Sequence, residues 1–299
     1  MDRAVIGMHK RRKSMFRRVA SATVAMLSVA FLAAPPVAAA TLPTPKDLTA
    51  YLDLECFKTS QYQPPATVLT LRHLNPVLSN LPIETVTLGP REQLCVPVAK
   101  NNQVPPSPAL DFLRFIDLSC YRISGVTVNT GLVLSHLNPL FQTYPRTQIT
   151  MTSPQQLCVP VVKNNAVPPA DILRLVRHID LKCYGITPNT SLNTQLGLRQ
   201  LNPVLVPIIP NHAAVVGFAR QLCVPVQKAG DTIPADVLNI IRWIDLEKFD
   251  LSVAATPQVG LTLRHINPVL ANLPAEQAVL TGASQLALPV AKNGAFPPG

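Results

Sequence analysis

Histidine recurs at one position of a sequence pattern that occurs four times along the chain, and it is the residue type here best suited to proton transfer or metal binding. The three histidines are His73, His136 and His265, and Gln200 takes the position in the remaining copy. Glutamine keeps a hydrogen bond, but it neither titrates nor serves as a good metal ligand. The sequence therefore predicts histidines that are hydrogen-bonded beside the core, without a catalytic or metal-binding role.

The six cysteines occupy two repeated positions. Three lie in the string Asp-Leu-x-Cys-(Phe/Tyr), and three lie in Gln-Leu-Cys-Val-Pro-Val-x-Lys. In the fourth copy both are replaced, by Lys248 and Ala287. Joint loss indicates that the two positions are partners, and the Cys-x-x-Cys spacing typical of metal sites does not occur. We expect the disulfides Cys56 to Cys95, Cys120 to Cys158 and Cys183 to Cys223.

Sequence motifs of common enzymes do not occur. There is no Gly-x-Ser-x-Gly string, phosphate-binding glycine loop, His-Glu-x-x-His string or calcium-binding loop. Paired cysteines are neither nucleophiles nor redox centres. The sequence therefore predicts no catalytic residues, no cofactor-binding residues and no metal ligands, and the expected protein is not an enzyme. A secreted enzyme with an unrecognised site is the less favoured alternative, and such a site should break the symmetry of the repeats.

An aromatic residue follows each first cysteine or its replacement, at Phe57, Tyr121, Tyr184 and Phe249. Such rings could line a repeated groove for a glycan or a peptide, but they are also typical of packing between strands. Aromatic residues make up only 5% of the chain, which favours packing. A ligand-binding module with one pocket per unit is the alternative function.

The two cysteine strings return every 63 to 65 residues, which indicates four tandem copies of one unit. A unit of about 60 residues buries too little surface to be stable without a staple. A disulfide that closes a loop of about 40 residues stabilises it by roughly 4 kcal/mol on the chain-entropy account. The expected fold is mainly β with short helices: four tandem small disulfide-stapled β-rich units joined by short linker helices. The fourth unit, without cysteines, is expected to be the least stable.

Local patterns predict the elements of a unit. The first cysteine string and residues 69–73 alternate in strand fashion, and each Asn-Pro, as at Asn75-Pro76, starts one short helical turn. Proline in the second cysteine string predicts an edge strand or a bulge. Between units, residues 170–179 place apolar side chains on one face of a helix. The Arg177 and Asp180 side chains at its end are expected to form a pair that is either solvated at the surface or sets the junction.

Positive charge is concentrated at the start of the chain. Of the net charge of +10, residues 1–40 hold seven basic and one acidic side chain, or +6, so +4 remains for the rest. This remainder forms no basic stripe, and with the single Trp243 it leaves nucleic-acid binding unsupported.

The start of the chain has a basic stretch, an apolar run and a small-residue site, which predict a cleaved signal peptide. The expected boundaries are a signal peptide at 1–40, a lead-in segment at 41–52, repeat units at 53–106, 117–169, 180–234 and 245–299, and linker helices at 107–116, 170–179 and 235–244.

The strings Cys-Tyr-x-Ile, at 120–123 and 183–186, and Leu-Cys-Val-Pro-Val-x-Lys-Asn resemble an uncharacterised cysteine-paired tandem repeat domain of exported bacterial proteins. The resemblance covers residues 53–299, although the fourth copy departs from it by lacking cysteines. It implies secretion, tandem copies and a mainly β unit, and it brings no known activity. No segment after the signal is apolar for long enough to span a bilayer. We therefore expect a secreted or cell-surface, non-enzymatic repeat protein with a structural or protein-interaction role, whose partner is a cell-surface or extracellular protein or polymer.

Overall fold

Strands dominate the described part of the chain, residues 41–299, in a computed structural model of the protein. The expectation of a mainly β fold with short helices is confirmed. The signal peptide predicted at residues 1–40 lies outside the described residues. The elements are, in chain order, α1 (Pro45–Thr49), β1 (Leu54–Thr59), β2 (Val68–His73), η1 (Pro76–Leu78), β3 (Glu84–Thr87), β4 (Arg91–Lys100), α2 (Ser107–Leu113), β5 (Leu118–Arg122), β6 (Thr130–His136), η2 (Pro139–Phe141), β7 (Thr147–Lys163), α3 (Ala170–Val176), β8 (Asp180–Thr187), β9 (Ser191–Gln200), β10 (His212–Lys228), α4 (Ala235–Ile241), β11 (Leu246–Val253), β12 (Val259–His265) and β13 (Glu276–Lys292).

Eight strands, two from each repeat, form a closed ring of antiparallel pairs. Within each repeat the first strand pairs with the last, giving β1–β4, β5–β7, β8–β10 and β11–β13. Between repeats the last strand pairs with the next first strand, giving β4–β5, β7–β8 and β10–β11, and β13 returns to β1. The four separate units expected in tandem are therefore not observed, and one 13-stranded sheet is found instead. Closing the ring removes the unpaired edges that each separate unit would expose.

The second strand of each repeat reaches the opposite repeat. β2 of the first repeat pairs with β10 of the third, and β9 of the third pairs with β4 of the first. In the same way, β6 of the second repeat pairs with β13 of the fourth, and β12 of the fourth pairs with β7 of the second. Each repeat is therefore hydrogen-bonded through its backbone to all three others.

The proline-containing strands, expected at a sheet edge or in a bulge, are instead the central strands β4, β7, β10 and β13. Pro97 in β4 shows why this is possible. On one side of β4 the neighbour changes from β5, which pairs as far as Cys95, to β9, which pairs from Val98. Pro97 lies at this change, where its carbonyl accepts a 2.9 Å hydrogen bond from Leu201 N. Its missing N–H therefore interrupts neither ladder.

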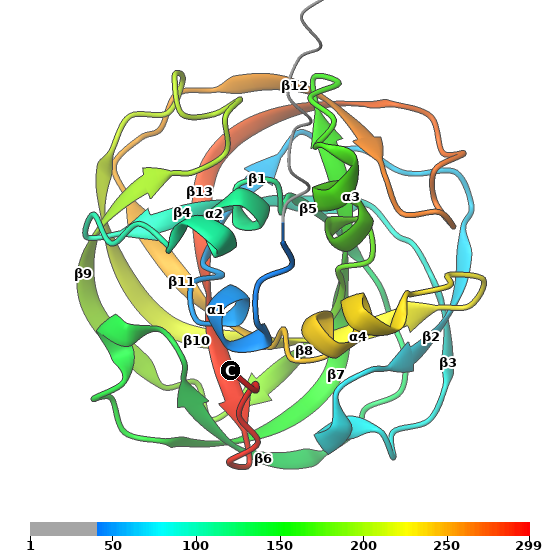
Figure 1. Ribbon diagram of the computed structural model, residues 1–299, viewed down its shortest axis with the longest axis vertical. Coiled ribbons are helices and arrows are strands. Elements are labelled where there is room, and N and C mark those ends of the chain that lie inside the picture. Colours follow the sequence, from blue (N-terminus) through cyan, green and yellow to red (C-terminus); the bar gives the residue numbers. More distant parts are fainter. Residues whose placement is uncertain (1–40) are drawn as a thin grey trace, which may run out of the picture. The chain divides into compact units, whose positions relative to one another are not determined.

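The four short helices gather at the centre of the ring of strands, as Figure 1 shows. Three were expected, at 107–116, 170–179 and 235–244, and α2, α3 and α4 form there with their last turns ending earlier. The lead-in segment adds α1. Consecutive helices contact one another and α4 contacts α1, so the helices also close a ring. They pack together on a shared core instead of separating independent units.

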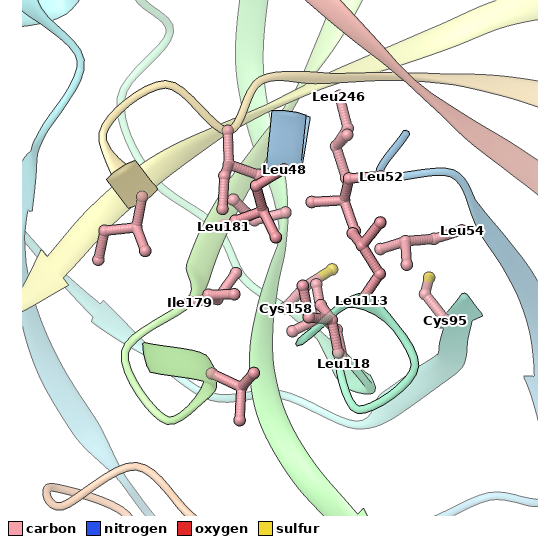
Figure 2. Packing of buried hydrophobic residues seen from close by; sticks show 14 of the residues in the cluster. Leu48, Leu52, Leu54, Cys95, Leu113, Leu118, Cys158, Ile179, Leu181 and Leu246 are labelled. Atoms are coloured by element: carbon pink, nitrogen blue, oxygen red, sulfur yellow. The ribbon is translucent and has the colours of Figure 1, made fainter. Parts of the chain in front are cut away.

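This shared core joins the apolar faces of the helices to the first strands of the repeats. Figure 2 shows Leu48 of α1 and Leu113 of α2 among the leucines of those strands. Each buried leucine contributes roughly 1.5–3 kcal/mol to the free energy of folding. In every repeat, the leucine that follows the aspartate of the first cysteine string is buried in this core. These leucines are Leu54, Leu118, Leu181 and Leu246.

The three expected disulfides are confirmed, and all six cysteines lie in this core. Neighbouring bonds are in contact, because Cys95 Sγ lies 3.7 Å from Cys120 Sγ and Cys158 Sγ lies 3.8 Å from Cys183 Sγ. The half-cystines of each bond face one another across the two ring strands of one repeat. The bonds are Cys56–Cys95, Cys120–Cys158 and Cys183–Cys223.

Lys248 takes the place of a cysteine in the fourth repeat, where it is the register partner of Ala287. Its ammonium group is buried and donates to Gln93 Oε1 at 2.6 Å and to Gln156 Oε1 at 2.8 Å. Burial lowers the pKa of Lys248 to about 7. The fourth repeat therefore replaces a covalent bond with two hydrogen bonds to the first and second repeats.

Aspartate, lysine and asparagine from the repeated strings form a buried triad at each of four junctions. At the second repeat, Asp117 pairs with Lys163, and Asn202 of the next repeat donates to Asp117 Oδ2 at 2.8 Å. Asn202 also donates to the carbonyl of Arg114 at the end of α2, at 3.0 Å. These contacts fasten each helix end to the following repeat. The equivalent triads are Asp53, Lys100 and Asn138; Asp180, Lys228 and Asn267; and Asp245, Lys292 and Asn75.

Two sequence expectations about these motifs have different outcomes. The Asn-Pro turns form as predicted, with Asn75 Oδ1 accepting from Val77 N at 2.9 Å at the start of η1. The pair expected between Arg177 and Asp180 is wrong. Asp180 is buried and pairs with Lys228, because the aspartate belongs to the inner triad and not to the helix surface.

The last residues of the chain lie against the start of α1. The Lys46 N–H donates to the Pro298 carbonyl at 3.0 Å, as the Leu110 N–H donates to the Pro106 carbonyl at 2.8 Å at the start of α2. The C-terminal segment thus meets α1 in the way that the first repeat meets α2. This contact places α1, the second repeat and residues 296–298 at one junction.

Candidate functional site

Each recurring histidine or glutamine lies against the opposite repeat. His73 Nε2 lies 3.0 Å from the Tyr184 hydroxyl, and His265 makes the equivalent contact with the tyrosine of the second repeat at 3.1 Å. Gln200 donates to Glu55 Oε2 at 2.6 Å. For these three positions the prediction of a hydrogen-bonded side chain beside the core is confirmed.

His136 does not follow this pattern. It faces Phe249, with ring centroids 6.0 Å apart, and phenylalanine has no hydroxyl to offer. Its Nδ1 is buried without a hydrogen-bond partner within residues 41–299, as are those of His73 and His265, but unlike those two it forms no hydrogen bond to a tyrosine hydroxyl. Burial, with a smaller contribution from Lys100, lowers the pKa of His136 to about 4. At neutral pH the ring is therefore uncharged.

His136 lines a pocket of about 430 Å³ between α1, the η2 turn and the C-terminal segment. The volume is in the range of sites for small organic molecules. Aromatic walls come from Tyr51, Tyr144 and Phe296. The remaining lining residues are Lys46, Asp47, Ala50, Ser135, Leu137, Pro139, Gln142, Arg146 and Pro297.

The equivalent junction of the next repeat is lined by larger side chains. There a cavity of only about 220 Å³ is lined by Arg114 and Arg199. In the repeat alignment these two arginines correspond to Ala50 and Ser135. Arginine also occupies both positions at the other two junctions, at Arg177 and Arg264 and at Arg242 and Arg72. The pocket beside His136 is therefore where the fourfold pattern is broken, by two small side chains.

Another cavity, of about 510 Å³, lies along α3 and the segment before α4 and is larger although Arg177, the equivalent of Ala50, lines it. Two of its charged lining groups are already paired within the protein. Arg174 bonds to both carboxylate oxygens of Asp236 at 2.6 and 2.7 Å, and His178 Nδ1 lies 3.0 Å from Asp231 Oδ2. We therefore take the pocket beside His136, whose ring forms no hydrogen bond within residues 41–299, as the candidate site.

Charge in the candidate pocket is unbalanced toward the positive. Lys46 and Arg146 line it, and neither has an ion-pair partner in the described part of the chain. Asp47 is the one carboxylate in the lining, and its Oδ2 accepts from Thr44 Oγ1 at 2.8 Å in the cap of α1. With His136 uncharged, the pocket carries a formal charge of about +1 at neutral pH.

Most of the residues singled out in the sequence lie elsewhere. The cysteines are bonded in the core, and Phe57, Tyr121, Tyr184 and Phe249 are buried packing residues that line none of the cavities described above. Of the recurring histidines only His136 reaches the pocket. Sequence reasoning missed Ala50 and Ser135, although the signal was visible as two departures from arginine in an otherwise repeated pattern.

Glu247 carries another of the buried side-chain atoms that lack a hydrogen-bond partner. Its Oε1 bonds to nothing in residues 41–299, and burial raises the pKa of Glu247 to about 8. The corresponding position in the third repeat holds Lys182, which forms an ion pair with Glu84, and in the first repeat it holds Glu55. Glu247 is therefore protonated at neutral pH, and it is charged only at a cost in stability.

We expect Glu247→Gln to stabilise the protein increasingly as the pH rises from 5 to 8.5. The folded pKa lies above the unfolded value, so the wild type loses stability across that interval while the glutamine variant does not. The difference in the free energy of unfolding between the variant and the wild type should grow by roughly 2–4 kcal/mol between pH 5 and pH 8.5, measured by urea unfolding at both pH values. Asp236→Asn, at an exposed carboxylate, is the control and should show no such increase. A constant offset for Glu247→Gln at both pH values would contradict the assignment.

Comparisons with known proteins gave no match: no family model fits the chain, and no curated protein and no solved structure matches it. Within residues 41–299 the structure also groups no three His, Cys, Asp or Glu side chains in a way that could hold a metal ion. No helix in the same range is long and apolar enough to cross a membrane.

Proposed function

We propose that the protein is an exported, non-enzymatic binding protein that holds one small organic ligand per chain in the pocket beside His136. The observation that carries the proposal is the replacement of two arginines by Ala50 and Ser135 at one of four equivalent junctions. An opening of this size, with rings and unpaired polar groups in its walls, has the composition of a ligand site.

The elements around the pocket are joined to one another by hydrogen bonds. α1 is fastened to the second repeat, because Asn138 donates to Ala50 O at 3.1 Å and to Asp53 Oδ2 at 3.0 Å. The C-terminal segment is fastened to α1 through Pro298. A site built on fixed elements loses little conformational entropy when a ligand binds.

A binding role is favoured over catalysis by the chemistry of the lining. Ser135, His136 and Asp47 all line the pocket, but no hydrogen bond joins Ser135 to His136 or His136 to Asp47 among the described residues. A serine nucleophile needs an adjacent base, and a histidine with a pKa of about 4 is a weak one. These residues therefore serve as hydrogen-bonding groups for a ligand.

Export is supported by the disulfides and by the signal sequence expected at residues 1–40. Three disulfides persist in oxidising compartments, which is consistent with an extracellular location. The resemblance to a cysteine-paired repeat domain of exported bacterial proteins points the same way. In this proposal the surface-partner role expected from repetition is secondary, because the repeats form one closed structure with a single distinctive junction.

The proposal is tested by refilling the pocket. Ala50→Arg with Ser135→Arg rebuilds the arginine pair of the other junctions, and it should abolish the capture of small molecules from spent culture medium, measured as bound mass by native mass spectrometry of the secreted chain. The control, Ser79→Arg with Ala271→Arg, adds the same two charges at exposed positions and should keep the bound mass. Wild-type protein that carries no ligand, or a refilled variant that still carries it, would overturn the proposal.

A further inference from the structure

The chemistry of the pocket lining specifies a ligand class. We propose that the pocket recognises a small organic monoanion, a carboxylate on a flat aromatic body. This inference rests on the proposed binding function and adds to it the charge and shape of the ligand. The charged groups, the aromatic rings and the neutral histidine of the lining each support this ligand class.

Two cations and one engaged carboxylate set the charge. Lys46 and Arg146 are both exposed side chains of the lining that make no ion pair within the described residues. Asp47 is already occupied in the cap of α1, where its backbone N–H donates to Thr44 Oγ1 at 3.1 Å and its Oδ2 accepts from the same hydroxyl. One ligand carboxylate would neutralise the remaining positive charge, and a guanidinium group suits a carboxylate because it donates two parallel hydrogen bonds.

Aromatic side chains set the shape. Tyr51, Tyr144 and Phe296 line the pocket, and Phe296 is 51% exposed at its mouth. Tyr144 is held in place, because its hydroxyl lies 2.5 Å from Thr194 Oγ1 and its ring packs edge-on against Phe141 at 5.3 Å. Fixed rings of this kind accept a flat apolar body by stacking or edge contacts.

The neutral state of His136 argues against a dianionic ligand. A protonated histidine would add a third cation and favour a dianion such as a phosphate ester. Because burial and Lys100 keep the ring neutral at physiological pH, His136 supplies one uncharged hydrogen-bonding group beside the ligand. The lining therefore matches one negative charge and not two.

The ligand class is tested with four probes of one shape that differ in charge. Isothermal titration calorimetry of the full secreted chain at pH 7 would compare 3-phenylpropanoate, 3-phenylpropanamide, phenylalanine and phenethylamine. We expect the carboxylate to bind at least tenfold more tightly than the amide and the amine, because a hydrogen bond to a charged group is stronger than a neutral one. Phenylalanine, a zwitterion, should bind more weakly than the plain carboxylate.

Matched variants assign the charge to its residues. Arg146→Ala should weaken 3-phenylpropanoate by about 10- to 100-fold and leave the amide within about twofold. Arg264→Ala, an exposed arginine at the position that corresponds to Ser135 in another repeat, is the control and should change neither. Equal binding of the amide and the carboxylate, preference for the amine, or no binding of any probe would overturn the ligand class. The bound mass seen in spent medium, and its loss on refilling the pocket, would still decide the binding function separately.

Discussion

A fourth disulfide should form when Lys248 and Ala287 are both changed to cysteine. The two residues are register partners across β11 and β13, as Cys56 and Cys95 are across β1 and β4. Closing a loop of about 40 residues stabilises the protein by roughly 4 kcal/mol on the chain-entropy account. The change also removes a buried amine whose pKa burial has lowered to about 7. Against this, Gln93 and Gln156 lose the donor that now satisfies their side-chain oxygens.

The net gain in the free energy of unfolding should be about 3 kcal/mol, measured by guanidinium unfolding without reductant. Lys248→Ser with Ala287→Ser is the matched control. Serine is close to cysteine in size and the lysine is lost in the same way, but serine cannot form the bond. This control should be less stable than the wild type because the glutamine oxygens stay unsatisfied. Peptide mapping should find the new bond and leave the other three unchanged. A cysteine variant no more stable than its serine control would show that the fourth position cannot accept the geometry of the others.

Covariation within the sequence was sufficient to predict the disulfides. Cysteine is present at both positions in three copies and absent from both in the fourth, and no tertiary knowledge is needed to pair them. The strands, the Asn-Pro turns and the helices between repeats were also predictable, because each depends on a local pattern of apolar residues, caps and breakers.

Closure of the ring could not be predicted in the same way. A repeated strand such as Leu118–Arg122 has the same sequence pattern whether it pairs with its own repeat alone or with a neighbour as well. The sequence contains a hint in Pro97 and its equivalents. They are excluded from an ordinary central strand by the missing N–H, and they fit where a strand changes neighbours. An edge strand or a bulge is the expected place for a proline, because either one leaves its missing N–H outside the ladder.

The candidate pocket combines residues that local patterns cannot bring together. Ala50 and Ser135 are 85 positions apart, and each departure from arginine is unremarkable alone. Only the fold shows that the end of α1 lies beside β6 of the second repeat, so that both losses fall at one junction. In a symmetric protein, comparing equivalent junctions is therefore more informative than searching for motifs.

The buried ion pairs of the triads lead to a prediction about stability. Lys163→Met should destabilise the protein by about 3–5 kcal/mol, because it leaves the buried carboxylate of Asp117 without its counterion. Adding Asp117→Asn removes the stranded charge and keeps an acceptor for Asn202, so the double variant should recover much of the loss. A double variant as unstable as the sum of both single changes would show that packing, and not charge, is at stake.

The same substitution at the two ends of the chain distinguishes a ring from a row. Lys100 and Lys292 belong to the first and last repeats, and each lies in a complete triad. Asn138 of the second repeat completes the triad of Lys100, and Asn75 of the first repeat completes that of Lys292 by reaching Asp245 at 2.8 Å. In a linear array, an end repeat lacks one neighbour and unfolds at a smaller cost to the whole. In a closed ring, Lys100→Met, Lys163→Met and Lys292→Met should lower the free energy of unfolding by similar amounts, in one cooperative transition seen by both fluorescence and circular dichroism. A separate early transition in Lys292→Met would mean that the fourth repeat opens alone and that the contacts between β13 and β1 are not enough to close the ring in solution.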